Sequence, residues 1–251
     1  MEVIYLNNLI KINDNLVVTI GQFDGIHKAH QTLITKTVYT AKTLNAKSAV
    51  ITFDPHIDTV LRNINPNDFI IDFESKKTIL NNLNVDYLLI INFNEEVSKI
   101  NHSNFFLQYL NNLNILEFII GFDFTYGYKG LGNIQTIETD YQKPVKITVI
   151  SKLELIGEKI GSLEIKKALT NGNIVKANEL LGYQFFINFQ IVNQTKDKIY
   201  LDSPNLSILK KQNYKVLIDG KQYILYNEKT AFIEKLDYFN DNQVIKAVFI
   251  D

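Results

Sequence analysis

The sequence contains no cysteine among its 251 residues, and this absence removes several kinds of chemistry at once. Without thiols the chain has no disulfides, no thiolate zinc site and no cysteine nucleophile. Tryptophan is also absent, while Asn, Ile and Lys are abundant. We interpret that bias as a property of codon usage and give it no functional weight.

Long apolar runs and a surplus of basic residues are missing as well. No run of about 18 apolar residues occurs, so we expect no membrane span, and residues 1–5 do not resemble a signal peptide. The 26 Lys and Arg face 27 Asp and Glu without forming a basic stripe, which disfavours a nucleic acid partner. These features predict a cytoplasmic protein, and they are compatible with small anionic ligands, because a loop of backbone N–H groups can hold such ligands without net positive charge.

Hydrophobic residues make up 46% of the chain, enough for a sizeable core. Over the first 184 residues, apolar runs alternate with helical periods. Predicted strands span 17–20, 48–53, 87–91, 118–120 and 145–150, and predicted helices span 31–44, 75–83, 103–110, 163–170 and 174–181. The runs lack in/out alternation, so we predict a Rossmann-like α/β fold with a parallel sheet covered on both faces. Such sheets bind ligands in the loops at the carboxyl ends of their strands.

The pattern changes at Phe185, after which short strands follow one another with turns such as Asp219-Gly220 and no helix between them. They span 186–192, 198–201, 214–218, 222–226, 231–236 and 244–250. This pattern predicts a small all-β, barrel-like domain over residues 185–251, behind an α/β domain over residues 1–184.

A glycine-containing turn joins the first predicted strand to the first long helix. Gly21 and Gly25 permit a tight turn with inward N–H groups, and the helix start adds further donors. His27 and His30 are three residues apart and therefore project on one side. The turn has three interpretations: a surface turn with two polar histidines, a zinc site completed by His56 but disfavoured by the lack of cysteine, or a phosphate site.

Five segments together resemble the bacterial FAD synthases, a bifunctional family of FMN adenylyltransferases and riboflavin kinases. They are Ile20–His30 (Gly-Asn-Phe-Asp-Gly-Val-His-x-Gly-His in the family), Thr52–His56 (Thr-Phe-Asp/Glu-Pro-His-Pro), Phe93–Phe106, Gly121–Gly127 (Gly-x-Asp-Phe-Arg-Phe-Gly) and Asn171–Gly182. The segments keep the order and spacing of the family over residues 17–184.

The resemblance implies an FMN adenylyltransferase that makes FAD and pyrophosphate from ATP and FMN. The FMN phosphate would attack the α-phosphorus of ATP in line, with Mg²⁺ accompanying the nucleotide. The implied ATP-binding residues are Gly21, Gln22, Phe23, Asp24, Gly25, Asp123 and Phe124, and the implied flavin-binding residues are Pro55 and His56. The implied catalytic residues are His27, His30, Ser162 and Lys166, and no residue is implied as a metal ligand.

The segment that contains Leu163 and Lys166 departs from the motif Ile-Ser-Ser-Thr-x-x-Arg of the family. Leu163 replaces the threonine and cannot donate a hydrogen bond, and Lys166 replaces the arginine without its bidentate fork. Each hydrogen bond lost to a charged group is worth about 1.5–3 kcal/mol. An alternative is therefore a degenerate homologue that binds ATP or flavin with little or no turnover. A transferase with another phosphate acceptor is a third hypothesis, which the Pro55-His56 loop disfavours.

Other departures are smaller in the first domain and larger in the second. Gln22 stands where the family has Asn, and Ala29 where it has Gly. In the second domain, only the segment Ser203–Leu206 resembles the Pro-Thr-Ala-Asn motif of the family's riboflavin kinase. We therefore expect a degenerate kinase barrel without kinase activity. Taken without the resemblance, Asp123 caps a turn and the glycines at 127, 130 and 132 form a flexible loop.

Overall fold

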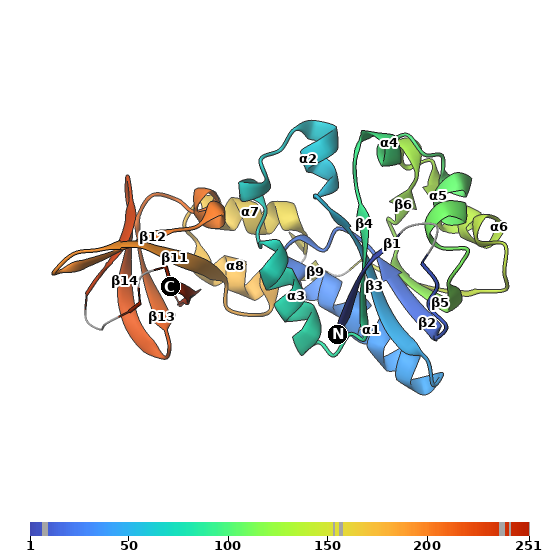
Figure 1. Cartoon of the computed structure of the whole chain (residues 1–251), viewed down its shortest axis with the longest axis horizontal. Coiled ribbons are helices and arrows are strands. Elements are labelled where there is room, and N and C mark those ends of the chain that lie inside the picture. The colour runs from blue at the N-terminus through green and yellow to red at the C-terminus, as the bar shows by residue number, and fades with distance from the viewer. Residues whose placement is uncertain (7–9, 153, 156–157, 236–238, 241, 251) are drawn as a thin grey trace. The chain divides into compact units, whose positions relative to one another are not determined.

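The computed structural model describes residues 1–6, 10–152, 154–155, 158–235, 239–240 and 242–250 (Figure 1). Contacts divide the chain into two compact units. The first comprises Met1–Phe23, Ala29–Asn65 and Lys76–Leu153, and the second Asp24–Lys28, Pro66–Ser75 and Glu154–Asp251. The proposed boundary after residue 184 stays a prediction.

The first unit contains a six-stranded sheet in the order β1-β4-β3-β2-β5-β8. Its strands are β1 (Glu2–Leu6), β2 (Asn15–Ile20), β3 (Lys47–Asp54), β4 (Tyr87–Asn92), β5 (Asn114–Gly121) and β8 (Lys146–Ile150). Every neighbouring pair is parallel. The predicted Rossmann-like α/β fold is thereby confirmed.

Strand β2 shows why the sheet is covered on both faces. Leu16, Val18 and Ile20 belong to a large core cluster with the side chains of α5 (His102–Tyr109) and α6 (Ile137–Tyr141). Val17 belongs to a second cluster that includes Ala41 of α1 (Lys28–Thr43). Alternate residues of one strand are therefore buried on opposite faces, which explains the unbroken apolar run in the sequence.

The sheet order also identifies the ligand edge. From β2 the chain crosses to β3 on one side, whereas β5 lies on the other side of β2. Crevices in open α/β sheets lie at such a switch point, outside the carboxyl ends of the strands. The turn after Ile20 occupies this position.

The remaining helices and short strands connect these elements. The helices are α2 (Ile57–Arg62), α3 (Phe73–Asn82), α4 (Glu95–Ser98), α7 (Ser162–Thr170) and α8 (Ile174–Leu181), with short 3₁₀ turns η1 (Asp24–Ile26), η2 (Pro66–Asp68), η3 (Tyr128–Gly130), η4 (Ile134–Thr136) and η5 (Pro204–Ile208). Two hairpins pair β6 (Thr125–Tyr126) with β7 (Gly132–Asn133) and β9 (Glu154–Leu155) with β10 (Glu158–Lys159). None of the helices in the described part of the chain has the length and apolar character needed to cross a bilayer.

The second unit contains a closed antiparallel barrel, as the pattern after Phe185 predicts. The strand order is β11 (Phe186–Gln194), β12 (Lys198–Asp202), β15 (Ala231–Glu234), β14 (Lys221–Asn227), β13 (Asn213–Ile218) and β16 (Val244–Phe249), and β16 pairs with β11 to close it. Phe185 and Tyr214 pack against Phe249 with ring centroids 5.3 and 5.4 Å apart. The predicted strand end at Leu236 lies outside the described residues.

Candidate active site

The turn after β2 has an unusual backbone. Phe23, Gly25 and Ile26 have φ angles of 52°, 75° and 38°, all in the left-handed region. A side chain at Gly25 would also meet Ile70, because a Cβ there would lie 3.0 Å from that residue's Cδ1 atom. Left-handed backbone at non-glycine residues is costly and clusters at ligand sites, where successive N–H groups form anion-binding concavities.

Within the second unit, contacts from several segments hold Asp24 and Gly25. The buried Asp24 carboxylate accepts a hydrogen bond from the Ile70 N–H at 2.9 Å and pairs with the Lys166 ammonium at 3.1 Å. Ser162 Oγ donates to the Asp24 carbonyl at 3.2 Å. Tyr183 donates to the Gly25 carbonyl at 2.6 Å, and burial, with the charge of Asp24, raises the pKa of Tyr183 and keeps its hydroxyl protonated.

These contacts place three of the sequence-predicted site residues, Asp24, Ser162 and Lys166, at one turn. The Lys166 ammonium also lies 4.7 Å from the centre of the Phe69 ring, within cation–π range. Its charge is balanced by the Asp24 carboxylate. Leu163, in the place of the family's threonine, is 61% exposed.

The two histidines lie at the start of α1. His27 is buried and directly precedes Lys28, the first residue of the helix. His30 lies in the first helical turn, and its ring meets the Phe23 ring edge-on, with centroids 5.1 Å apart at 77°. By packing, His27 belongs to the second unit and His30 to the first.

Gln22 links the turn to two other segments of the first unit. Its carbonyl oxygen accepts hydrogen bonds from the Lys76 ammonium at 2.7 Å and from Thr52 Oγ1 at 3.3 Å. Its side-chain oxygen accepts from the Ile57 N–H at 3.4 Å. The turn is therefore connected to the segment that contains Pro55 and His56. Sequence reasoning missed Lys76, because one lysine in a helical pattern carries no sign of its burial.

The loop after β3 orients His56. The Asp54–Pro55 peptide bond is cis, and His56 is the N-cap of α2, where its Nδ1 atom accepts a hydrogen bond from the Asp58 N–H at 3.1 Å. With Nδ1 as acceptor in the neutral ring, Nε2 carries the proton.

The loop after β5 carries Asp123 and Phe124. The Phe124 ring stacks on Tyr126, with centroids 5.6 Å apart and an interplanar angle of 22°. Asp123 is exposed. The expectation of a flexible glycine loop beyond it is wrong, because Tyr128 N–H donates to the Ile100 carbonyl at 2.7 Å. Gly127, with φ 71°, lies so close to α5 that a Cβ would sit 2.6 Å from the backbone of His102.

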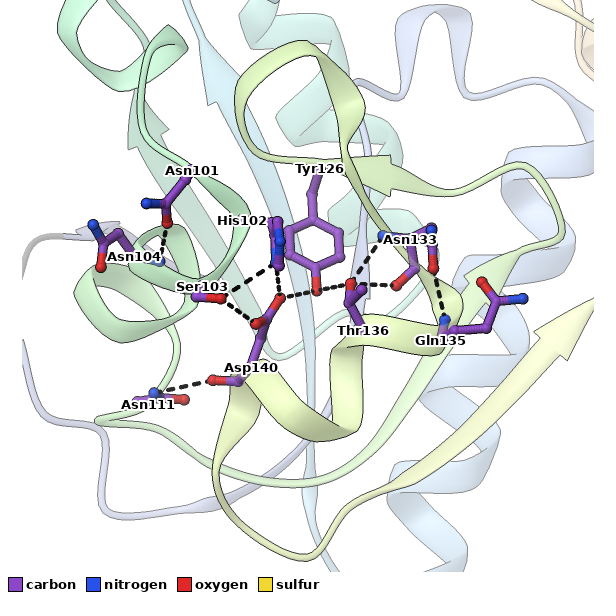
Figure 2. Close-up of polar contacts among 10 residues, drawn as sticks. All are labelled: Asn101, His102, Ser103, Asn104, Asn111, Tyr126, Asn133, Gln135, Thr136 and Asp140. Atoms are coloured by element: carbon purple, nitrogen blue, oxygen red, sulfur yellow. Dashed lines mark hydrogen bonds and ion pairs between the residues drawn. The ribbon is translucent and has the colours of Figure 1, made fainter.

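A buried polar network, unforeseen in the sequence, fixes this loop (Figure 2). Asp140 of α6 accepts hydrogen bonds from Ser103 Oγ at 2.6 Å and from the Tyr126 hydroxyl at 2.5 Å, and its carboxylate lies 2.6 Å from His102 Nδ1. The Tyr126 hydroxyl also lies 2.7 Å from Thr136 Oγ1. Burial raises the pKa of Asp140, but the bonds from Ser103, Tyr126 and His102 outweigh it and leave this pKa below its ordinary value. The carboxylate is therefore charged and fully used in holding α5, α6 and the β6–β7 hairpin together.

The segment Ser203–Leu206, which resembles the kinase motif, lies in the second unit. Ser203 and Asn205 are buried, and the Asn205 side-chain amide donates to the Phe69 carbonyl at 2.9 Å. Ser207 Oγ donates to the Asn67 carbonyl at 3.0 Å. This segment therefore anchors residues 66–75 to the unit that contains the barrel.

Fold and turn together define a Rossmann-like α/β protein with a left-handed, N–H-rich turn at the switch point of its sheet. A family described as FAD synthetase matches residues 9–164. The chain belongs to this family.

Two relatives agree with that assignment, and a solved structure has the same fold. The chain is 30% identical over 219 residues to the bifunctional riboflavin kinase/FMN adenylyltransferase of Listeria monocytogenes, which covers 85% of this chain and 70% of the relative. It is 35% identical over 181 residues to the protein of the same name from Bacillus subtilis, with 72% and 57% covered. A crystal structure described as a macrolide-efflux protein from Streptococcus pneumoniae has a TM-score of 0.83 at 21% identity and covers 100% of this chain and 90% of its own. At that identity the likeness concerns the fold alone.

Proposed function

We propose that this protein is an FMN adenylyltransferase, which makes FAD from MgATP and FMN. An oxygen of the FMN phosphate forms a bond to the α-phosphorus of ATP, and the bond from that phosphorus to the bridging oxygen breaks to release pyrophosphate. The observation that carries the proposal is the family match over residues 9–164. That range contains the strained turn at the switch point of the sheet.

The proposed roles follow from what each group can do chemically. The N–H groups of residues 22–25 and the imidazoles of His27 and His30 hold the phosphates and stabilise charge on the oxygens of the α-phosphorus during transfer, whereas the Gly21 N–H donates to the Ile51 carbonyl at 3.0 Å and shapes the turn. Catalysis then consists of alignment and charge stabilisation, because the attacking phosphate is already an anion. Asp123 and Phe124 lie beside the adenosine, and Pro55 and His56 beside the flavin.

Mg²⁺ enters in this proposal as part of the MgATP substrate. The ion prefers oxygen ligands and is commonly shared with substrate phosphates. The buried carboxylate of the turn itself, that of Asp24, is engaged by Lys166 and the Ile70 N–H. Asp24, Ser162 and Lys166 therefore act by holding the turn in its left-handed shape.

A binding protein with little turnover is the second candidate, and two observations favour it. Leu163 is exposed and cannot donate a hydrogen bond, and the Lys166 charge is balanced by Asp24. For the barrel we propose no riboflavin kinase activity, because Asn205 of the motif's echo is used to anchor Phe69.

One assay separates these possibilities. Purified protein is incubated with MgATP and FMN, and FAD is followed by chromatography, with ATP binding measured in parallel by calorimetry. The adenylyltransferase proposal expects FAD well above a heat-inactivated control. ATP binding without FAD formation would leave the binding protein. A second reaction with riboflavin and MgATP should yield no FMN, and appreciable FMN would refute the proposal for the barrel.

A further inference from the structure

The side chain of Gln22 carries a buried hydrogen-bond donor at the ligand turn. Its amide oxygen accepts a hydrogen bond from the Ile57 N–H at 3.4 Å. Its amide nitrogen, Nε2, is also buried, and no residue in the described part of the chain accepts a hydrogen bond from it. Buried polar groups are nearly always hydrogen-bonded, and an unpaired one costs stability. This orphaned donor therefore indicates an acceptor that a ligand supplies.

The bond from Ile57 shows which end of the amide is the donor. The oxygen and the nitrogen of a glutamine amide have nearly the same shape, so their places follow from the hydrogen bonds around them. Because the backbone N–H of Ile57 can only donate, the amide oxygen of Gln22 faces it. The NH₂ group consequently points away from Ile57, toward the place where an acceptor is required.

Gln22 lies where two loops of the first unit meet. Its backbone belongs to the turn after β2, where its carbonyl oxygen accepts hydrogen bonds from Lys76 and Thr52. Its side chain contacts the first residue of α2, which directly follows Pro55 and His56. Glutamine is one methylene longer than the asparagine of the family, so in this protein the amide lies further from the turn and closer to that second loop.

Under the proposed function these two loops hold different substrates, with the ATP phosphates at the turn and the flavin beside Pro55 and His56. The FMN phosphate connects them, because one of its oxygens must come within about 3–3.5 Å of the α-phosphorus before the new bond forms. A donor between the turn and the flavin loop is therefore placed to contact this phosphate. An amide suits the task, because it orients the phosphate without giving up its proton, and the attacking oxygen stays an anion.

We propose that the side-chain amide of Gln22 binds the FMN phosphate and aims its attacking oxygen at the α-phosphorus of ATP. This inference rests on the proposed function, in which FMN is the acceptor. The two ends of the amide then have different tasks: the oxygen holds the loop at Ile57, and the nitrogen holds the substrate.

The test compares the binding of FMN and of riboflavin, which differ only in the phosphate, by calorimetry. An ATP analogue with a methylene group between the α- and β-phosphorus atoms is present, because it prevents the transfer. We expect Gln22→Met to weaken FMN binding about tenfold or more, as the loss of a hydrogen bond to a charged group implies, and to leave the binding of riboflavin and of the analogue within about twofold of the wild type. The matched control Gln108→Met changes an exposed glutamine of α5 and should bind all three ligands like the wild type.

A second variant, Gln22→Glu, keeps an oxygen for the Ile57 N–H but replaces the NH₂ group with a second oxygen. It should weaken FMN binding more than Gln22→Met does, because it also places a negative charge near the phosphate, and riboflavin binding should stay unchanged. The barrel is the same in every variant, so a difference from the wild type reports on the turn. Circular dichroism checks that each variant is folded.

Three outcomes would overturn the inference. They are FMN binding by Gln22→Met that equals the wild type, an equal loss for FMN and riboflavin, which indicates a contact with the flavin ring or a structural role, and a loss confined to the ATP analogue, which assigns the amide to the triphosphate. If Gln22→Met is unfolded, FMN and riboflavin binding by Gln22→Glu decide in the same way. A wild-type protein that binds FMN but makes no FAD refutes the proposed function, while the comparison of FMN with riboflavin still decides the role of Gln22.

Discussion

Replacing Tyr126 with phenylalanine tests whether the Asp140 network holds the loop that carries Asp123 and Phe124. The substitution removes one hydroxyl and keeps the ring, so the contacts with Phe106 at 4.7 Å and with Phe124 at 5.6 Å remain. The hydroxyl makes one hydrogen bond to the Asp140 carboxylate and one with Thr136.

The expected loss of stability in Tyr126→Phe follows from the removal of these two hydrogen bonds. A hydrogen bond to a charged group contributes about 1.5–3 kcal/mol and one between neutral groups about 0.5–1.5 kcal/mol. Asp140 retains Ser103 and His102 as partners, and Thr136 retains the Asn133 N–H and carbonyl. We therefore expect the free energy of unfolding to fall by about 2–3 kcal/mol.

Urea denaturation of the wild type, Tyr126→Phe, Asp140→Asn and the double variant measures this directly. Tyr128→Phe is the matched control, because Tyr128 lies in the same loop but is 40% exposed, and it should change stability by less than about 0.5 kcal/mol. A coupling energy below about 0.5 kcal/mol between Tyr126 and Asp140 would refute the reasoning, since contacting partners in one network couple by more.

Three further predictions follow from other contacts. The pKa of Asp140 in the folded protein lies below its ordinary value. The charged carboxylate therefore stabilises the folded protein fully at pH values above the pKa of about 3.9 that Asp has in the unfolded chain. This stabilisation is lost as the pH falls through the pKa of the folded protein. The stability difference between wild type and Asp140→Asn should thus be constant from about pH 5 to 7 and narrow below about pH 4, and an unchanged difference would contradict it. Lys166→Met leaves the buried Asp24 without its cation and should cost up to about 3 kcal/mol in urea denaturation, with the exposed Lys167→Met as a neutral control; equal stabilities would show that the pair is unimportant. His30→Ala should lower FAD formation at least tenfold with unchanged circular dichroism, and wild-type turnover would remove His30 from the mechanism.

Most of the fold could be predicted, because strands of a sheet that is buried on both faces appear in the sequence as unbroken apolar runs. The run from Val17 to Ile20 has no polar face, and this property places β2 in the middle of a parallel sheet. Strand β1 was not predicted, because Glu2–Leu6 is largely exposed and contributes to the core mainly through Leu6, while its backbone pairs with β4. The start of β5 at Asn114 was missed for a similar reason, since its first residues alternate between exposed and buried.

The contacts that support the candidate site could not be predicted in the same way. His102 and Asp140 are 38 residues apart, and nothing in either segment indicates that they meet. The ion pair between Asp24 and Lys166 likewise joins distant segments. Such pairs depend on how the elements pack, whereas the turn itself is local and is visible from Gly21, Gly25 and the histidine spacing.

The most direct test of the central claim is a crystal structure of the protein with a non-hydrolysable ATP analogue and Mg²⁺. We expect the triphosphate within hydrogen-bonding distance of the N–H groups of residues 22–25, with the rings of His27 and His30 directed at its oxygens. A triphosphate bound elsewhere, or imidazoles that face solvent while the nucleotide is present, would contradict it.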